Sequence, residues 1–190
     1  MASGLIHALR TRGVRTFLII WFGQLISLVG TNMTGFALGV YVYQGTGSVT
    51  QFALISLFVT LPTILLSPFA GALVDRWDRR TVLILSDTGA GLSTLAIFLL
   101  LASGRLEVWM IYLATGISSA FSAFQWPAYS ASTALLVPKE HFGRASGMTQ
   151  LNEAAAQIVA PAIAGAVVVT IGVQGVIFID FVTFGFAVLT

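Results

Sequence analysis

Long apolar stretches alternate with short polar breaks along most of the chain. A helix needs about 20 apolar residues to cross the ~30 Å hydrocarbon layer of a bilayer. Turn-forming and charged residues gather at the breaks, which fall at residues 44–48, 75–80, 103–105, 137–140 and 172–175. The pattern predicts an all-α membrane protein with six transmembrane helices, at residues 17–43, 49–74, 81–102, 108–134, 145–171 and 173–190.

The main structural alternative is a transmembrane β-barrel, whose strands alternate apolar and polar residues. Runs such as residues 95–101 are continuously apolar and do not alternate. The sequence therefore favours helices, arranged as a cytoplasmic tail (residues 1–16) and a six-helix domain (residues 17–190).

Composition supports a membrane environment. The chain is 57% hydrophobic and 8% charged, with a mean hydropathy of +0.94, whereas soluble domains have roughly 25% charged residues. Cysteine is absent, which excludes disulfides and thiolate metal sites. The net charge of +2 is scattered, so no basic face is expected to bind nucleic acid.

The basic residues indicate the orientation of the helices. With a cytoplasmic N-terminus, eight of the nine Lys and Arg residues fall on the cytoplasmic side, and only Arg105 lies in an external loop. Cytoplasmic loops are enriched in basic residues. We therefore expect a multi-pass protein of the plasma (inner) membrane with both termini in the cytoplasm.

The end of the chain suggests a longer protein. The last predicted helix stops inside an apolar run, with no basic residue after it. We expect the chain to be truncated at or near the end of its sixth helix, or to be one half of a longer protein.

The break between the second and third predicted helices holds a dense group of acid and base. Asp75 could accept hydrogen bonds from the free N–H groups that open the third helix, and the arginines could bond the carbonyls that end neighbouring helices. A preceding glycine would let helices approach closely. The residues of this group are Gly71, Asp75, Arg76, Arg79 and Arg80. The alternative is a plain positive-inside loop.

The spacing Gly-x-x-x-Asp-Arg-x-x-Arg-Arg resembles the signature loop of the major facilitator superfamily. Residues 37–48 and 61–68 are similar to the macrolide-efflux and siderophore-exporter branch of that superfamily. The resemblance implies a fold of twelve helices in two halves, each with a 3+3 inverted repeat, which moves a small solute by alternating access. This chain would be the N-terminal half, its partners a second six-helix half and the lipid bilayer, and the loop a conformational switch.

Two positions depart from the family pattern. Asp78 replaces the usual glycine of the loop, and Tyr112 replaces an arginine found four residues before a glycine, here Gly116, in proton-coupled relatives. Proton coupling through such an arginine is therefore not expected.

Polar groups within the predicted helices are the candidate site residues, because ionisable groups at depth usually face a cavity or a partner. Glu153, with Gln157 at i+4, lies about two turns into the fifth predicted helix and could carry a proton away from water. A neutral or hydrogen-bonded glutamate near the inner interface is the alternative. Asp87 and Asp180 lie on helices that are peripheral in the family, so structural pairing is expected for both. Amide and aromatic groups on the two helices that line the cavity in the family suit an amphipathic solute, although hydrogen bonding between helices would explain each of them equally well. These residues are Gln24, Asn32 and Thr34 on the first helix, and Gln125, Trp126 and Tyr129 on the fourth.

A Pro-Gly pair on the fifth predicted helix, Pro161 and Gly165, could let that helix bend. Close packing by small side chains is the alternative explanation.

An intramembrane enzyme is the competing class. It needs a nucleophile beside a base, or a cluster of metal ligands. Both histidines fall outside the predicted helices, and a Gly-x-Ser-x-Gly sequence is absent. We therefore expect no catalytic residue, metal or cofactor. A third alternative is a structural or nonfunctional six-helix protein.

Overall fold

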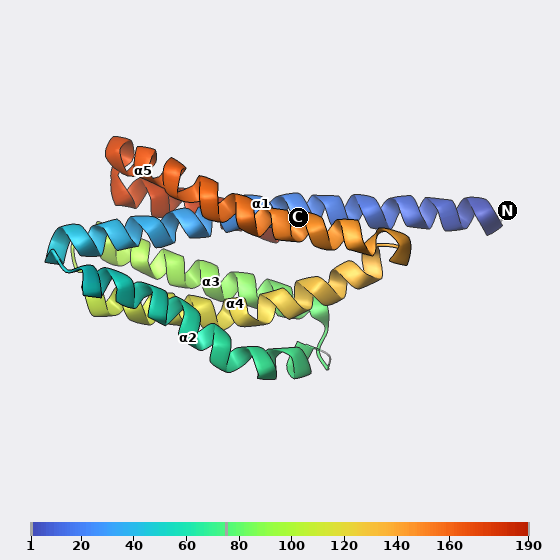
Figure 1. Cartoon of the computed structure of the whole chain (residues 1–190), viewed down its shortest axis with the longest axis horizontal. Coiled ribbons are helices and arrows are strands. Elements are labelled where there is room, and N and C mark those ends of the chain that lie inside the picture. The colour runs from blue at the N-terminus through green and yellow to red at the C-terminus, as the bar shows by residue number, and fades with distance from the viewer. Residues whose placement is uncertain (1, 75, 190) are drawn as a thin grey trace.

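A computed structural model describes the backbone of residues 2–74 and 76–189, and the side chains of residues 13–74 and 76–187. All regular elements of this part are helices (Figure 1). They are α1 (Ala2–Thr46), α2 (Val49–Val74), α3 (Arg79–Ala102), α4 (Val108–Leu136), the short 3-10 helix η1 (Lys139–His141) and α5 (Phe142–Leu189). The predicted helical class is confirmed, and the predicted boundaries of α2 are met at both ends.

Two of the predicted breaks contain a glycine whose backbone lies in the left-handed region. Gly47 (φ 66°) separates α1 from α2, and Gly104 (φ 67°) follows the end of α3. At the second break the N–H of Arg105 donates to the carbonyl of Leu100 at 3.0 Å. Glycine adopts such angles without steric strain, which explains why these helices end where they do.

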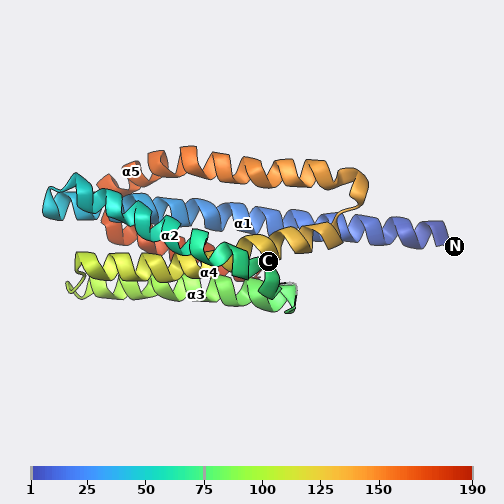
Figure 2. The ribbon, with the colours of Figure 1, turned by 60° about the horizontal axis from the view of Figure 1, so that its bottom comes forward.

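Helix α5 contains a third such glycine. Its 48 residues would measure ~72 Å as one straight helix, far more than a bilayer is thick. Gly172 breaks the helix with φ 77° and ψ 175°. Figures 1 and 2 show the ribbon running to one end of the molecule and returning from there. We call residues 142–171 the first arm of α5 and residues 173–189 the second arm.

The described part of the chain thus has five α-helices where the hydropathy pattern predicts six. The predicted spans 145–171 and 173–190 fall on the two arms of one element. The break itself is one residue, Gly172, rather than the predicted 172–175, and Gly175 is helical. Helix α1 also begins much earlier than residue 17, at Ala2.

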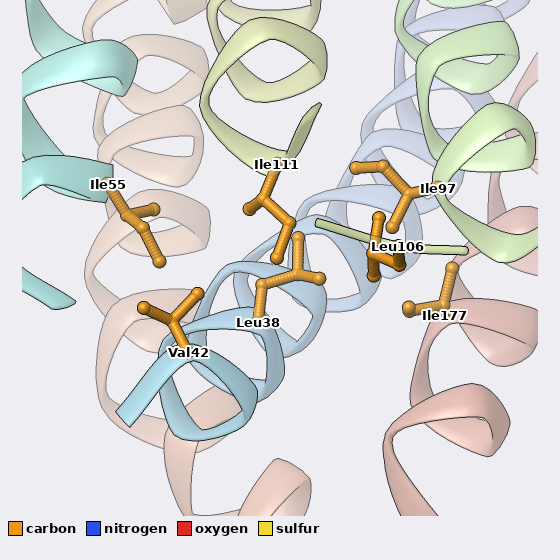
Figure 3. Close-up of a cluster of buried hydrophobic side chains, with 7 residues drawn as sticks. All are labelled: Leu38, Val42, Ile55, Ile97, Leu106, Ile111 and Ile177. Atoms are coloured by element: carbon orange, nitrogen blue, oxygen red, sulfur yellow. The ribbon is translucent and has the colours of Figure 1, made fainter. Parts of the chain in front are cut away.

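The second arm is part of the hydrophobic core. Figure 3 shows Ile177 beside Leu106 and Ile97, in a cluster of seven buried side chains. The cluster also holds Leu38, Val42, Ile55 and Ile111, so every α-helix contributes to it. Since the contacts come from α1 through to α5, the second arm packs with the bundle.

Among the described residues, four helical segments are long and apolar enough to cross a membrane, at residues 13–46, 49–74, 79–102 and 139–187. Helix α4 is long enough, with 29 residues, but is not among them. It differs from the others by a series of Ser, Thr, Gln, Trp and Tyr side chains along its length. The polar character of α4 has a structural explanation in the pocket described next.

Candidate functional site

A pocket of about 210 Å³ lies between α1, α4 and the first arm of α5. It is lined by Gln24, Leu28, Ser122, Gln125, Trp126, Tyr129, Thr149, Asn152 and Glu153. Five of these are residues that the sequence singled out: Gln24, Gln125, Trp126, Tyr129 and Glu153. Gln24 is at least 101 positions from the other four in the chain, and the packing of three helices brings them together.

Helical spacing explains which side chains reach the pocket. Ser122, Gln125, Trp126 and Tyr129 recur at three- and four-residue intervals, so they share one face of α4. Thr149, Asn152 and Glu153 do the same on α5. The Asn152 amide nitrogen donates to the backbone carbonyl of Trp21 at 3.2 Å, which fixes α5 against α1 beside the pocket.

A chain of hydrogen-bonded side chains runs from the pocket into the bundle. The Gln125 Nε2 atom donates to Gln24 Oε1 at 3.1 Å and to Asp87 Oδ1 at 2.5 Å. Asp87 comes from α3 and is 8% exposed. The expected structural pairing of Asp87 is therefore present, but its partner is a residue of the pocket wall.

Tyr129 places a buried hydroxyl at the same pocket. Its residue is 7% exposed, and the hydroxyl makes no hydrogen bond of normal geometry with a described residue. The hydroxyls of Thr133 and Thr149 are close. Each donates to a backbone carbonyl of its own helix, and each oxygen can still accept from the Tyr129 hydroxyl. Tyr129 and Thr149 thus bring two hydroxyl groups to the pocket wall.

The remaining polar candidates differ in their relation to the pocket. Glu153 lines the pocket, and its side chain is exposed. Gln157 is exposed and does not line the pocket. The Asn32 amide donates to the carbonyl of Leu28 at 2.8 Å, on its own helix, and also lies outside the pocket. These helices are apolar on nearly every side, so the sequence did not indicate which face points inward.

The Pro-Gly pair lies away from the pocket. Helix α5 is continuous through Pro161 and Gly165, and its only non-helical residue is Gly172. The neighbouring Ala160 and Ala164 are fully buried against Met33 and Ala37 of α1. Close packing by small residues accounts for this segment, and bending at Pro161 stays a prediction.

In the loop before α3, the helix cap is not the residue that the sequence suggested. The capping acid is Asp78, whose Oδ1 accepts the backbone N–H of Thr81 at 2.9 Å. Asp75 lies outside the described residues. A Cβ atom at Gly71 would meet nothing within 4 Å, so that glycine is not needed for close approach. An acid three positions before Thr81, at the start of an apolar run, is the capping signal that could have identified Asp78.

Asp78 gives a first testable prediction. The hydrogen bond from the Thr81 backbone N–H holds the pKa of Asp78 below its ordinary value of 3.8. Stability from this cap is therefore fully present above pH 3.8 and is lost as the pH falls through the lowered pKa. In detergent at neutral pH, we expect Asp78→Ala to melt at a lower temperature than the parent.

Asp78→Asn is the matched control, because an amide oxygen can still cap the helix. The melting temperature of Asp78→Asn should lie between those of the parent and Asp78→Ala. As the pH falls and the Asp78 carboxylate becomes protonated, the melting temperature of the parent should approach that of Asp78→Asn. Equal melting of Asp78→Ala and the parent at neutral pH would contradict the capping role.

A second buried acid, Asp180, lies on the second arm of α5. Its Oδ1 accepts the hydroxyl of Thr31 at 3.3 Å, and its backbone carbonyl accepts the hydroxyl of Thr183 at 2.8 Å. Gly30 of α1 lies directly against it. This arrangement matches the structural pairing expected from the sequence and ties the second arm to α1.

These features define a helical, multi-pass membrane protein with a polar pocket among its helices. Residues 20–190 match the sequence model of the Major Facilitator Superfamily. The chain therefore belongs to this superfamily.

The chain is also similar to curated proteins over most of its length. Macrolide efflux protein A of Streptococcus pyogenes is 35% identical over 153 residues, which cover 78% of this chain and 36% of that protein. The uncharacterized MFS-type transporter YkuC of Bacillus subtilis is 30% identical over 90% of this chain and 39% of its own length. The enterobactin exporter EntS of Shigella flexneri is 26% identical over 83% of this chain and 38% of its own. The match thus spans little more than a third of each relative.

Proposed function

We propose that this chain is the N-terminal half of a secondary transporter that exports a small amphipathic solute by alternating access. The observation that carries the proposal is the pocket of amides, aromatic rings and one carboxylate among α1, α4 and the first arm of α5. Such a mixture suits a solute with an apolar body and a few polar groups. Two relatives are named as an efflux protein and an exporter, which supports the outward direction.

The same proposal includes six helices and a second half. The two arms of α5 would be the fifth and sixth spans, separated at Gly172. A pocket of about 210 Å³ is smaller than the ~300–1,000 Å³ of complete drug-sized sites. A second six-helix half would supply the opposite wall, in keeping with alignments that cover 36% to 39% of the relatives named above.

The loop before α3 would act as the conformational switch of this transporter. Arg76 and Arg80 are exposed there and could bond helix ends that move during transport. Asp75 and Arg79 would belong to the same switch, as the resemblance to the signature loop implies.

Topology gives the second prediction. With both termini in the cytoplasm of the inner membrane, reporter fusions after Thr46 and after Lys139 should report opposite sides, external and internal. The reason is the bias of basic residues toward the cytoplasmic segments. Alkaline phosphatase and green fluorescent protein fusions at both positions would measure this. Both sites on one side would contradict the proposed arrangement.

The third prediction tests the pocket with two tryptophans of α4. Trp126 lines the pocket and is 50% exposed, whereas Trp109 is 55% exposed and lies outside it. We expect Trp126→Ala to raise the solute concentration for half-maximal transport about tenfold, equivalent to ~1.4 kcal/mol of lost binding. Trp109→Ala is the matched control and should change it little.

The measurement is efflux of a labelled macrolide, the solute class named for one relative, from cells expressing the complete transporter proposed above, with this chain as its N-terminal half. Other amphipathic solutes form a panel in the same assay. Equal effects of the two substitutions would remove the pocket from the proposal. Absence of transport for the whole panel would favour the alternative, a structural six-helix protein without activity of its own.

A further inference from the structure

The hydrogen-bonded chain from Asp87 through Gln125 to Gln24 carries an inference beyond solute binding. We propose that Asp87 is a proton-binding site and that its protonation reverses the direction of the hydrogen bonds along this chain. The reversal changes the group that Gln24 offers to the pocket from a donor to an acceptor. This inference rests on the proposed function, because it assumes that the pocket binds a solute.

The first step is the state with Asp87 ionised. A carboxylate only accepts hydrogen bonds, and an amide nitrogen has two protons to donate. The Gln125 nitrogen uses both, one toward Asp87 Oδ1 at 2.5 Å and one toward Gln24 Oε1 at 3.1 Å. The Gln24 oxygen is engaged, and its amide nitrogen also bonds the Asp87 carboxylate. One Gln24 N–H is then left for the pocket that this residue lines.

The second step is the uptake of one proton from water by the Asp87 carboxylate. Its new O–H must donate, and the two amide side chains that bond the carboxylate, Gln125 and Gln24, are in place to accept. We follow the turn at Gln125, whose nitrogen bonds both other members of the chain. An amide satisfies this by a 180° turn that exchanges its oxygen and nitrogen without changing its shape. The turned Gln125 oxygen has two lone pairs, so it also accepts an N–H from Gln24 once that amide turns too. The Gln24 oxygen then faces the pocket.

The surroundings of Asp87 hold no side-chain cation in the described part of the bundle. A buried carboxylate needs a cation or hydrogen-bond donors for partners. The elements packed against α3 are chiefly α4 and α5, whose titratable groups within the bundle are Tyr112, Tyr129, Glu153 and Asp180, all acidic. Within residues 81–104, 106–138 and 145–187, and along residues 16–74 of α1 and α2, there is no Lys, Arg or His.

The nearest basic residues on the same helix are Arg79 and Arg80. They lie at the start of α3, about two turns from Asp87, and Arg80 is exposed to solvent. The Asp87 carboxylate therefore has amides rather than side-chain cations for partners. Binding a proton would neutralise its charge.

The reversal couples the proton to the solute. A solute whose acceptor group binds the Gln24 N–H holds Asp87 in its ionised state, and so it disfavours the proton. By linkage the proton disfavours that solute to the same degree. Mutual exclusion of two ligands at one site is the condition that a transporter needs to exchange one for the other.

The proposal can be tested without any solute. The protein is labelled with carbon-13 and nitrogen-15 in Asp and Gln side chains, placed in lipid nanodiscs and titrated by NMR from about pH 4 to about pH 9, a range that spans carboxyl and imidazole titration. We expect the Asp87 carboxyl carbon and the side-chain amides of Gln24 and Gln125 to shift with one common midpoint. The amide of Gln157, which lies outside the pocket, should not share it.

Two substitutions complete the test. Asp87→Asn should abolish the titration of both glutamine amides, and Asp180→Asn, a second buried acid with no bond to either glutamine, should preserve it. Should Asp87→Asn not fold, the common midpoint in the parent still decides. The proposal is overturned if Asp87 does not titrate in this range, or if it titrates while the two amides stay constant. A positive titration in a protein that transports nothing would retain the proton switch and reject the transport function.

Discussion

Replacing Gly30 with alanine is expected to destabilise the bundle by about 1–3 kcal/mol, the usual effect of forcing an extra carbon into a packed contact. A Cβ atom at Gly30 would lie 3.1 Å from the Cα atom of Asp180 and 2.9 Å from its Oδ1. The first of these belongs to the backbone of a helix, which cannot turn aside as a side chain can. Thermal unfolding in detergent should show a lower melting temperature, by roughly 2–4 °C for each kcal/mol.

Gly35 is the matched control on the same helix. A Cβ atom there would meet nothing within 4 Å. Because alanine favours a helix over glycine by roughly 0.5–1 kcal/mol, Gly35→Ala should be neutral or slightly stabilising. A lower melting temperature for Gly30→Ala together with an equal or higher one for Gly35→Ala would show that the second arm of α5 packs against α1. Equal melting temperatures for the two variants would argue against that packing.

The helices could be predicted well because hydropathy reports directly on which segments leave water. The predicted breaks contain Gly47, Gly104 and Gly172, and all three glycines have positive φ. Their positions follow from local rules that need no knowledge of the bundle. The extension of α1 to Ala2 was not predicted, since the basic residues before residue 17 were taken as a tail rather than as helix.

The pocket could be predicted only in part, because it depends on which faces of the helices meet. Gln125, Trp126 and Tyr129 stand out on α4, whose many polar residues form one face against the pocket. On α5 the sequence makes Glu153 and Gln157 equally good candidates for the pocket. Of these two, the packing places Glu153 at the pocket wall and Gln157 outside it. The role of Asp87 was missed because its partner Gln125 is 38 residues away. A hydrogen bond across that separation exists only once α3 and α4 pack together.

Helix α4 illustrates how function and stability share one element. Its Gln125 nitrogen is bonded on both sides, to α1 and to α3. A hydrogen bond also joins α2 to α4, because the hydroxyl oxygens Thr63 Oγ1 and Ser119 Oγ lie 2.8 Å apart. Polar residues therefore hold α4 against three neighbours and leave one face for the pocket. This use of its polar groups explains why the helix is less apolar than a lipid-exposed span needs to be.

The largest effect on activity is expected at Asp87. The sequence suggested Glu153 as the proton-carrying group, because it was expected to lie away from water. In the structure Glu153 is exposed and Asp87 is buried, joined to the pocket through Gln125. In proteoliposomes containing the complete transporter, Asp87→Asn should lower transport driven by an imposed pH gradient by roughly the 5–150-fold typical of coupling free energies.

The design separates coupling from folding and from binding. Downhill movement of the labelled solute should fall less in Asp87→Asn than transport driven by the pH gradient, because asparagine keeps the approximate shape of the side chain but does not titrate. Asp180→Asn removes a buried acid that has no bond to the pocket glutamines, and its response to the pH gradient should resemble that of the parent. Glu153→Gln should also retain that response, although its affinity for a cationic solute should fall. If Glu153→Gln loses the response while Asp87→Asn keeps it, the proton is carried at the pocket wall, and the hydrogen bond between Asp87 and Gln125 serves only to hold α3 against α4.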